Sequence, residues 1–184
     1  MTDNYIKIGI ISDIIFEPYL TYLLKLYFGN KILLFVIPFQ EYNNEKYKNQ
    51  LKNCGEVIVW LNFESLFPNA DNQGNTDAIK KQQIEETVAF CDKICKDLVE
   101  LINVQILWFL FEDYFSYSPR VFGNRYYSLI DVINLKLCEK LDKQIVLINL
   151  KQIIAQIGID NAYDLKNKYR WNAPYSKSLI EAAV

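Results

Sequence analysis

Five short apolar runs, separated by longer stretches with helical spacing, constrain the fold of this chain more than any other feature. The runs occupy residues 5–11, 31–37, 56–61, 104–111 and 144–148, and each has the length and β-branched content of a strand. They are continuously apolar instead of alternating with polar residues. This pattern is typical of strands that are buried on both faces of a parallel sheet.

The intervening segments supply helices that would cover such a sheet. Helical periodicity or helix boundary signals are found at residues 19–28, 77–103, 125–141 and 150–157, and the polar stretch 40–53 has room for a short helix. Strands and helices thus alternate along residues 1–184, which predicts one domain. We expect a three-layer α/β/α sandwich with a mostly parallel five-stranded sheet in the flavodoxin-like order 2-1-3-4-5.

The chain of 184 residues contains no histidine, which removes several kinds of active site. A Ser-His-Asp triad, a Cys-His dyad and a His-ligated metal site are excluded within this chain. Acid–base chemistry would fall to Asp, Glu, Lys, Tyr or Cys side chains with a shifted pKa. The net charge of −2 argues against a nucleic-acid surface, because such a surface needs clustered basic residues.

The four cysteines match no zinc or redox spacing. Cys91 and Cys95 share one apolar face of a predicted helix, so we expect them in the core and regard half of a metal site as the weaker alternative.

The first residues lack the basic region of a signal peptide, and no apolar run approaches the ~20 residues of a membrane-spanning helix. The sequence therefore predicts a cytoplasmic protein without a membrane span.

Polar side chains follow four of the predicted strands at the edge where parallel sheets bind ligands. This predicted rim consists of Ser12, Asp13, Asn62, Glu64, Glu112, Asp113 and Asn149. Capping of helix N-termini is the structural alternative to a binding role for each of them. The glycine-rich turn of a dinucleotide site is missing, so we expect no cofactor. The carboxylates come from different loops and their spacing demands no convergence, so we expect no obligatory metal either.

Two of these positions carry a resemblance to a known enzyme group. A serine after the first strand and an asparagine after the third resemble the arrangement of SGNH (GDSL-type) hydrolases. The resemblance implies a nucleophile at Ser12, an oxyanion donor at Asn62 and an acidic residue at Asp164, in the block that supplies the base in that family. This sequence departs from the pattern because the last block lacks histidine and residues 11–13 are Ile-Ser-Asp.

A second resemblance fits these departures. The stretches 16–20 (FEPYL), 59–66 (VWLNFESL), 163–165 (YDL) and 171–176 (WNAPYS) resemble the N-terminal SGNH-like domain of FkbH-like enzymes. In that family a HAD-type second domain loads a glyceryl unit onto an acyl carrier protein. The resemblance implies that such a domain would begin near the end of this chain. The chain is then either an excised domain or one part of a split enzyme.

The resemblance implies two functions of different classes. One is a non-hydrolytic accessory domain that recruits or positions an acyl carrier protein for a HAD-type catalytic domain. The alternative is a divergent hydrolase or acyltransferase that uses Ser12 without a histidine base. Candidate partner-binding residues are Asp13, Glu64, Asp113, Tyr117, Arg120, Arg125 and Trp171. The arginines suit an anionic group, and Lys166, Lys168 and Arg170 add local positive charge.

Overall fold

The computed structural model describes residues 5–14, 31–66, 77–112, 127–141, 144–164, 166–167, 170 and 175–183. Its centre is a sheet in which all four neighbouring strand pairs are parallel. The strands are β1 (Ile6–Ser12), β2 (Ile32–Pro38), β3 (Glu56–Trp60), β4 (Gln105–Phe109) and β5 (Ile145–Ile148). Their order, β2-β1-β3-β4-β5, confirms the predicted topology.

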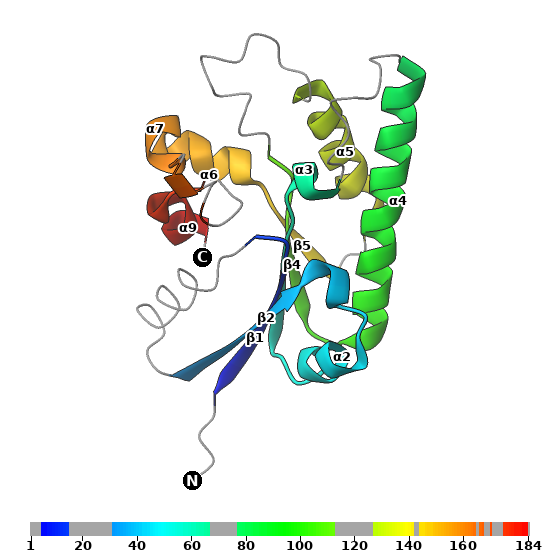
Figure 1. Cartoon of the computed structure of the whole chain (residues 1–184), viewed down its shortest axis with the longest axis vertical. Coiled ribbons are helices and arrows are strands. Elements are labelled where there is room, and N and C mark those ends of the chain that lie inside the picture. The colour runs from blue at the N-terminus through cyan, green and yellow to red at the C-terminus, as the bar shows by residue number, and fades with distance from the viewer. Residues whose placement is uncertain are drawn as a thin grey trace.

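Helices cover both faces of this sheet (Figure 1). One layer contains α2 (Glu45–Leu51), α3 (Phe63–Leu66), α4 (Asp77–Leu101) and α5 (Tyr127–Lys140), together with the 3-10 turn η2 (Phe39–Glu41). The other layer contains α6 (Leu150–Ile157), α7 (Ile159–Ala162) and α9 (Lys177–Ala183). The three-layer α/β/α sandwich is therefore confirmed. The helix predicted at 19–28 lies outside the described residues.

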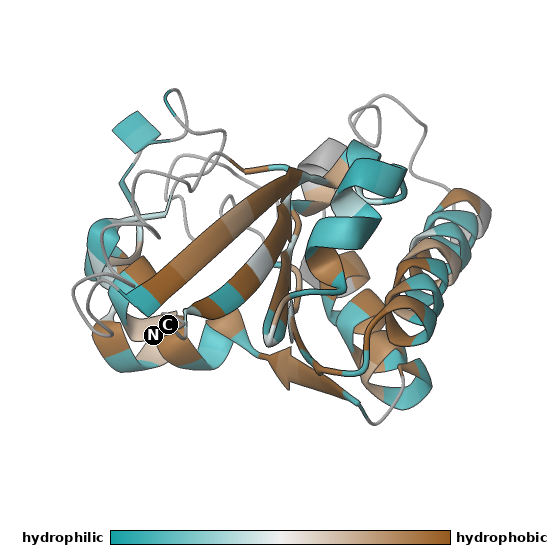
Figure 2. Ribbon diagram, turned by 90° about the horizontal axis from the view of Figure 1, so that it is seen from below, coloured by the Kyte–Doolittle hydropathy of each residue, from teal (hydrophilic) through white to brown (hydrophobic). Residues whose placement is uncertain are grey.

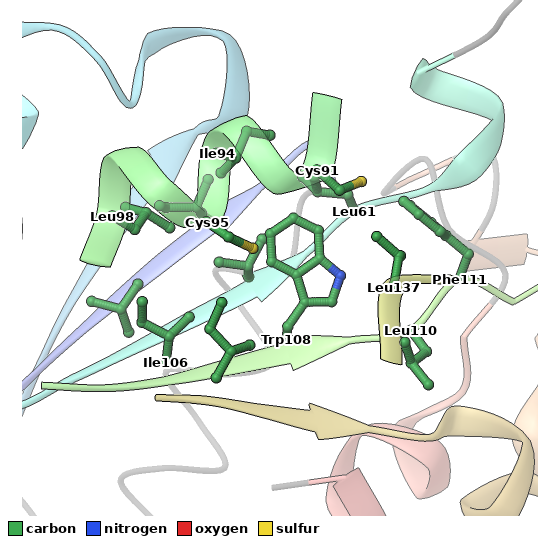
Figure 3. Close-up of a cluster of buried hydrophobic side chains, with 14 of the residues drawn as sticks. Leu61, Cys91, Ile94, Cys95, Leu98, Ile106, Trp108, Leu110, Phe111 and Leu137 are labelled. Carbon is green, nitrogen blue, oxygen red and sulfur yellow. The ribbon is translucent and has the colours of Figure 1, made fainter. Parts of the chain in front are cut away.

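The sheet separates two hydrophobic cores, which explains why its strands are apolar on both faces. The larger core contacts α2, α4 and α5, and the smaller one contacts α6 and α9. In the larger core Trp108 of β4 packs beneath α4, with Cys91, Cys95 and Leu137 around it (Figure 3). Hydropathy follows this division, because the strands are mostly apolar while the helices carry polar stripes (Figure 2).

Strand register brings the carboxyl ends of the first three strands to the same level. Ser12 at the end of β1 is the register partner of Pro38 in β2 and of Trp60 in β3. The polar residues that follow β1 and β3 therefore begin side by side at one edge of the sheet. This is the edge where the sequence predicts a site.

Candidate site at the carboxyl edge of the sheet

Ser12 is a buried part of the backbone network at this edge. Only 4% of its surface is exposed. Its hydroxyl donates a hydrogen bond to the carbonyl oxygen of Trp60 (2.7 Å) and accepts one from the amide of Ile14 (3.0 Å). The first bond joins β1 to β3 and the second closes the turn after β1. The hydroxyl that the sequence offers as a nucleophile thus serves two backbone groups.

Asp13 and Asn62 meet, as expected for residues that follow neighbouring strands. The Asp13 carboxylate accepts a hydrogen bond from the backbone amide of Asn62 (2.9 Å). The contact joins the loops after β1 and β3, and it uses the main chain of Asn62. Glu64 lies one residue into α3, and its side chain is outside the described part of the structure.

The segment after β4 is held by a residue that the sequence did not suggest. Asn134 of α5 accepts a hydrogen bond from the amide of Phe111 (3.0 Å) and donates one to the carbonyl of the same residue (2.8 Å). This double contact fixes the backbone immediately before Glu112, which is 8% exposed. The sequence did contain a signal for this role. Asn134 lies on a predicted helix whose residues Ile130, Ile133 and Leu137 form an apolar face, and a polar side chain next to such a face needs a hydrogen-bond partner.

The end of β5 is occupied by capping and an ion pair. The side chain of Asn149 accepts a hydrogen bond from the amide of Lys151 (3.0 Å) and so caps α6. The ammonium group of Lys151 pairs with the carboxylate of Asp131 in α5. Because α5 and α6 lie in different layers, this pair passes the end of the sheet at β5. For Asn149 the capping alternative is therefore correct.

Asp164 belongs to a C-terminal segment that is anchored on the same edge. Its carboxylate accepts a hydrogen bond from the amide of Lys166 (3.0 Å), and its side chain is exposed. Asn167 is 4% exposed and donates to the carbonyl of Tyr175 (2.7 Å). Tyr175 in turn forms an antiparallel bridge with Tyr163, and its ring centroid lies 5.4 Å from that of Trp60.

These contacts connect Asp164 to the Ser12 edge indirectly. Trp60 accepts the Ser12 hydrogen bond through its backbone and contacts Tyr175 through its ring. The ring of Trp60 also stacks on Phe109 of β4, with centroids 4.1 Å apart. Asn167 occupies the third position after Asp164, where the Asp-x-x-His block would place its histidine. Here that position carries a buried structural amide, which sequence reasoning missed.

Five of the predicted site residues are not placed. The residues outside the described part of the chain are Asp113, Tyr117, Arg120, Arg125 and Trp171.

Within the described ranges, no group of three or more Asp, Glu, Cys or His side chains is arranged to hold a metal ion. The four cysteines are free thiols, of which Cys54, Cys91 and Cys95 are buried and Cys138 is exposed. Among the helices that the structure describes, none is long and apolar enough to cross a membrane.

The contacts of Ser12 do not match those of an activated serine. An activated serine needs a base within hydrogen-bond reach of its hydroxyl and space for a reacting carbonyl. Here the hydroxyl donates to a carbonyl oxygen, which is no base at neutral pH, and the side chain is buried.

Comparison with known proteins shows similarity at the level of the fold. No protein-family model matches the chain, and no curated protein matches it. One similar solved structure is the N-terminal part of the protein BF1531 from Bacteroides fragilis, described as containing a phosphatase domain complexed with Mg. It superimposes with a TM-score of 0.67 at 12% identity over 96% of this chain, and this chain spans about half (49%) of it.

A second similar structure is the lipase Lip_vut3 from a goat rumen metagenome. Its TM-score is 0.63 at 12% identity, and the match covers 96% of this chain and 92% of the lipase. Both similarities support the α/β/α fold described above. At 12% identity, neither similarity identifies the reaction or the ligand.

Proposed function

We propose that this chain is a non-hydrolytic, SGNH-like accessory domain of an FkbH-like biosynthetic enzyme. It recruits or positions an acyl carrier protein for a HAD-type catalytic domain in the cytoplasm. The observation that carries the proposal is the state of Ser12, whose buried hydroxyl bonds to the Trp60 carbonyl and the Ile14 amide in a chain without histidine. A domain that keeps the fold and lacks an activated nucleophile is suited to binding.

The fold comparison supports pairing with a second domain. The solved N-terminal part of the Bacteroides protein is about twice as long as this chain and is described as containing a phosphatase domain. The lipase, in contrast, matches over nearly its whole length, and it is the reason to keep a direct test of hydrolysis. Independently of these structures, the sequence motifs around Asn62 and Tyr163 resemble those of FkbH-like enzymes, in which a HAD-type domain follows.

The C-terminal segment offers a surface for an acidic partner. Lys166 and Arg170 are exposed four residues apart, and neither forms an ion pair with another described residue. The neighbouring Asn167 anchors this basic turn through its bond to Tyr175. Acidic carrier proteins are attracted to such local positive charge even when the net charge of the domain is −2. Arg120 and Arg125 remain part of the proposed surface on the evidence of the sequence.

The first experiment tests the absence of hydrolysis. We expect the protein to cleave a short p-nitrophenyl ester no faster than buffer does, and Ser12→Ala to leave that rate unchanged. Circular dichroism of the variant confirms that it is folded. A rate above buffer that disappears in folded Ser12→Ala would contradict the proposal and support the hydrolase or acyltransferase alternative.

The second experiment tests recruitment with a carrier protein from the same pathway. The double variant Lys166→Glu/Arg170→Glu should slow association roughly tenfold at low ionic strength, with a smaller effect on dissociation. The matched control is Lys52→Glu/Lys93→Glu, which makes the same charge change at the exposed C-cap residue of α2 and at an exposed position of α4. Equal loss in both variants, or binding that is insensitive to salt, would count against docking on the basic turn.

A further inference from the structure

The chain between Tyr163 and Tyr175, which we call the C-terminal loop, begins and ends at the same point of the fold. These two residues form an antiparallel bridge, and the amide of Ser176 donates a hydrogen bond to the carbonyl of Ala162 (2.9 Å). The hydroxyl of Ser176 also donates to the carbonyl of Asn161. The C-terminal loop is therefore closed at its base, and surface loops of this length with adjacent ends are frequently functional.

The base of the C-terminal loop is packed on the sheet. Tyr175 is 4% exposed, and its ring centroid lies 5.4 Å from that of Trp60 in β3. Both side chains belong to the smaller core, which also contacts α6 and α9. The backbone carbonyl of Trp60 accepts the hydrogen bond from Ser12. The loop thus starts from a well-packed part of the protein beside the Ser12 edge.

Asn167 attaches the C-terminal loop to its base a second time. Residues 166, 167 and 170 are helical, and Asn167 is the buried one of these three, with 4% of its surface exposed. Its side-chain amide donates to the carbonyl of Tyr175 (2.7 Å), and its backbone amide donates to the carbonyl of Asp164 (3.0 Å). A buried side-chain amide needs such a partner, so this contact holds the inner side of the basic turn against the loop base.

The outer side of the basic turn carries two cations. Lys166 and Arg170 are four residues apart, which places them on one helical face, and both are exposed. Neither forms an ion pair with another described residue. The carboxylate of Asp164 accepts a hydrogen bond from the backbone amide of Lys166 (3.0 Å), which fixes the start of the turn. The buried amide of Asn167 therefore determines where two exposed positive charges stand.

We propose that Asn167 is a positioning residue that presets Lys166 and Arg170 for docking of the acidic carrier protein. This inference rests on the proposed function, and it gives the reason why the basic turn is able to act as a docking site. Fixed charges attract an acidic surface during its approach, whereas charges on a loosely held segment must first be ordered when the partner docks. Because Asn167 is buried, it acts through its two exposed neighbours and not by touching the carrier.

Hydrogen exchange tests the anchoring without any partner. Asn167→Ala should speed the exchange of the Lys166 and Ser176 amides at least tenfold, because the bond to Tyr175 no longer holds the turn at the loop base. The amide of Gly55, which is hydrogen-bonded at the start of β3 (2.8 Å), is the internal reference and should exchange as in the wild type. Unchanged exchange at Lys166 would overturn the proposal.

A double-mutant cycle with the carrier protein shows whether Asn167 acts through the two cations. We expect Asn167→Ala to slow association roughly fivefold at low ionic strength. Lys166→Glu/Arg170→Glu should slow association of the wild type roughly tenfold, but only about twofold in the Asn167→Ala background. A purely structural loss would leave the tenfold factor unchanged. Equal factors in the two backgrounds would therefore overturn the proposal.

Tyr42→Phe is the matched control for the loss of a hydrogen bond. Tyr42 is also buried, and its hydroxyl donates to the carboxylate of Asp97 (2.9 Å) on the opposite face of the sheet. This variant should leave both the exchange of the Lys166 amide and the association rate unchanged. If Asn167→Ala does not fold, Asn167→Gln takes its place, because it keeps the donor on a longer stem and so displaces the turn. It must then show the same loss of coupling.

The two measurements separate this inference from the function on which it rests. A wild-type protein that binds no carrier would contradict the proposed function, and the exchange at Lys166 would still decide whether Asn167 holds the turn. Carrier binding that depends on Lys166 and Arg170 but has equal factors in the cycle would support the proposed function and overturn the positioning role of Asn167.

Discussion

At the carboxyl end of β1, the local backbone determines what a serine side chain does. A hydroxyl has one proton and two lone pairs, and at Ser12 the proton goes to the Trp60 carbonyl while a lone pair accepts from the Ile14 amide. Removing the hydroxyl would leave both backbone groups buried without this partner. Ser12 therefore stabilises the junction of β1 and β3, which is also the position where a nucleophile would stand.

Gly9 is the residue whose small size matters most for the packing of α2. A Cβ atom at this position would lie 2.9 Å from Cδ2 of Leu51 and 3.3 Å from Sγ of Cys54. Leu51 is fully buried and has little room to move. We expect Gly9→Ala to lower the free energy of unfolding by about 1–3 kcal/mol in urea denaturation. Gly55→Ala is the control, because its Cβ would meet nothing closer than 3.8 Å, and an equal loss there would refute the packing argument.

The edge of the sheet at Ser12 could be predicted from the sequence, but the hydrogen bonds that its side chains form could not. The polar residues after apolar runs identified Ser12, Asp13 and Asn62, because strand ends are visible in hydropathy. Which atom of each residue forms the contact depends on register and turn geometry, and these involve residues nearly 50 positions apart. For the same reason Asn134 and Asn167, whose partners are backbone groups elsewhere in the chain, could not be recognised.

At the scale of elements, one carboxylate joins α4 and α5, the two longest of the helices that the structure describes. Asp92 of α4 contacts Lys96 in its own helix (2.9 Å) and Lys140 at the end of α5 (3.2 Å). Its side chain is 14% exposed. Desolvation by burial opposes its charge, but the hydrogen bonds from Lys96 and Lys140 outweigh this and lower the pKa of the Asp92 carboxyl. Beside this ion pair, α4 and α5 leave a surface groove of about 430 Å³ that is also lined by Lys140.

This ion-pair network should make stability depend on pH in acid. Because the folded-state pKa of Asp92 is lowered, its contribution is complete above the unfolded-state pKa and is lost as pH falls through the folded-state value. Asp92→Asn should cost about 1 kcal/mol at pH 7 and little at the acid end. Denaturation at a series of pH values measures this difference. The control is Glu85→Gln, at an exposed position of α4 without a described ion pair. Its difference in unfolding free energy from the wild type should not depend on pH in this way.

Elements were more predictable than contacts because burial on both faces leaves a strong hydropathy signal. All five strands and the helices α4, α5 and α6 were identified, within a few residues at each end. The strand expected at 104–111 already ends at Phe109. Leu110 and Phe111 lie beyond its end, but they are buried like the residues of the strand. A continuous apolar run indicates which residues are buried but not which of them form strand hydrogen bonds. The end of β4 could therefore not be predicted from the sequence.

At the scale of the whole molecule, the C-terminal segment closes the layer opposite α4. Ser176 caps α9 through a bond from the amide of Leu179 (3.1 Å), and its own amide bonds to the carbonyl of Ala162 (2.9 Å). Leu179 and Ile180 then pack into the smaller core. Among the described helices, α2, α3, α4 and α5 cover one face of the sheet and the C-terminal helices α6, α7 and α9 cover the other. Because both layers pack on the same sheet, we expect them to unfold together.

The buried cysteines allow this cooperativity to be measured. Burial raises the pKa of the Cys91 thiol to about 12, and it raises that of Cys54 to about 11 despite the opposing charge of Lys7. At pH 8 the thiolate fraction of each is then about 0.001 or less. Because the thiolate is the reactive form and these side chains are shielded, we expect only Cys138 to react quickly with Ellman's reagent in the folded protein.

Global unfolding should then expose the other three thiols at one common rate. The control is Cys138→Ser, which removes the fast reaction and leaves the slow one. Cys54 contacts α2 and β1 while Cys91 lies in the middle of α4, so the two report on different parts of the same core. If the layers unfold together, the slow rate should follow the free energy of unfolding as urea is added, with equal slopes for Cys54 and Cys91. Faster labelling of Cys54 in native conditions would mean that α2 opens independently of the rest of the sheet.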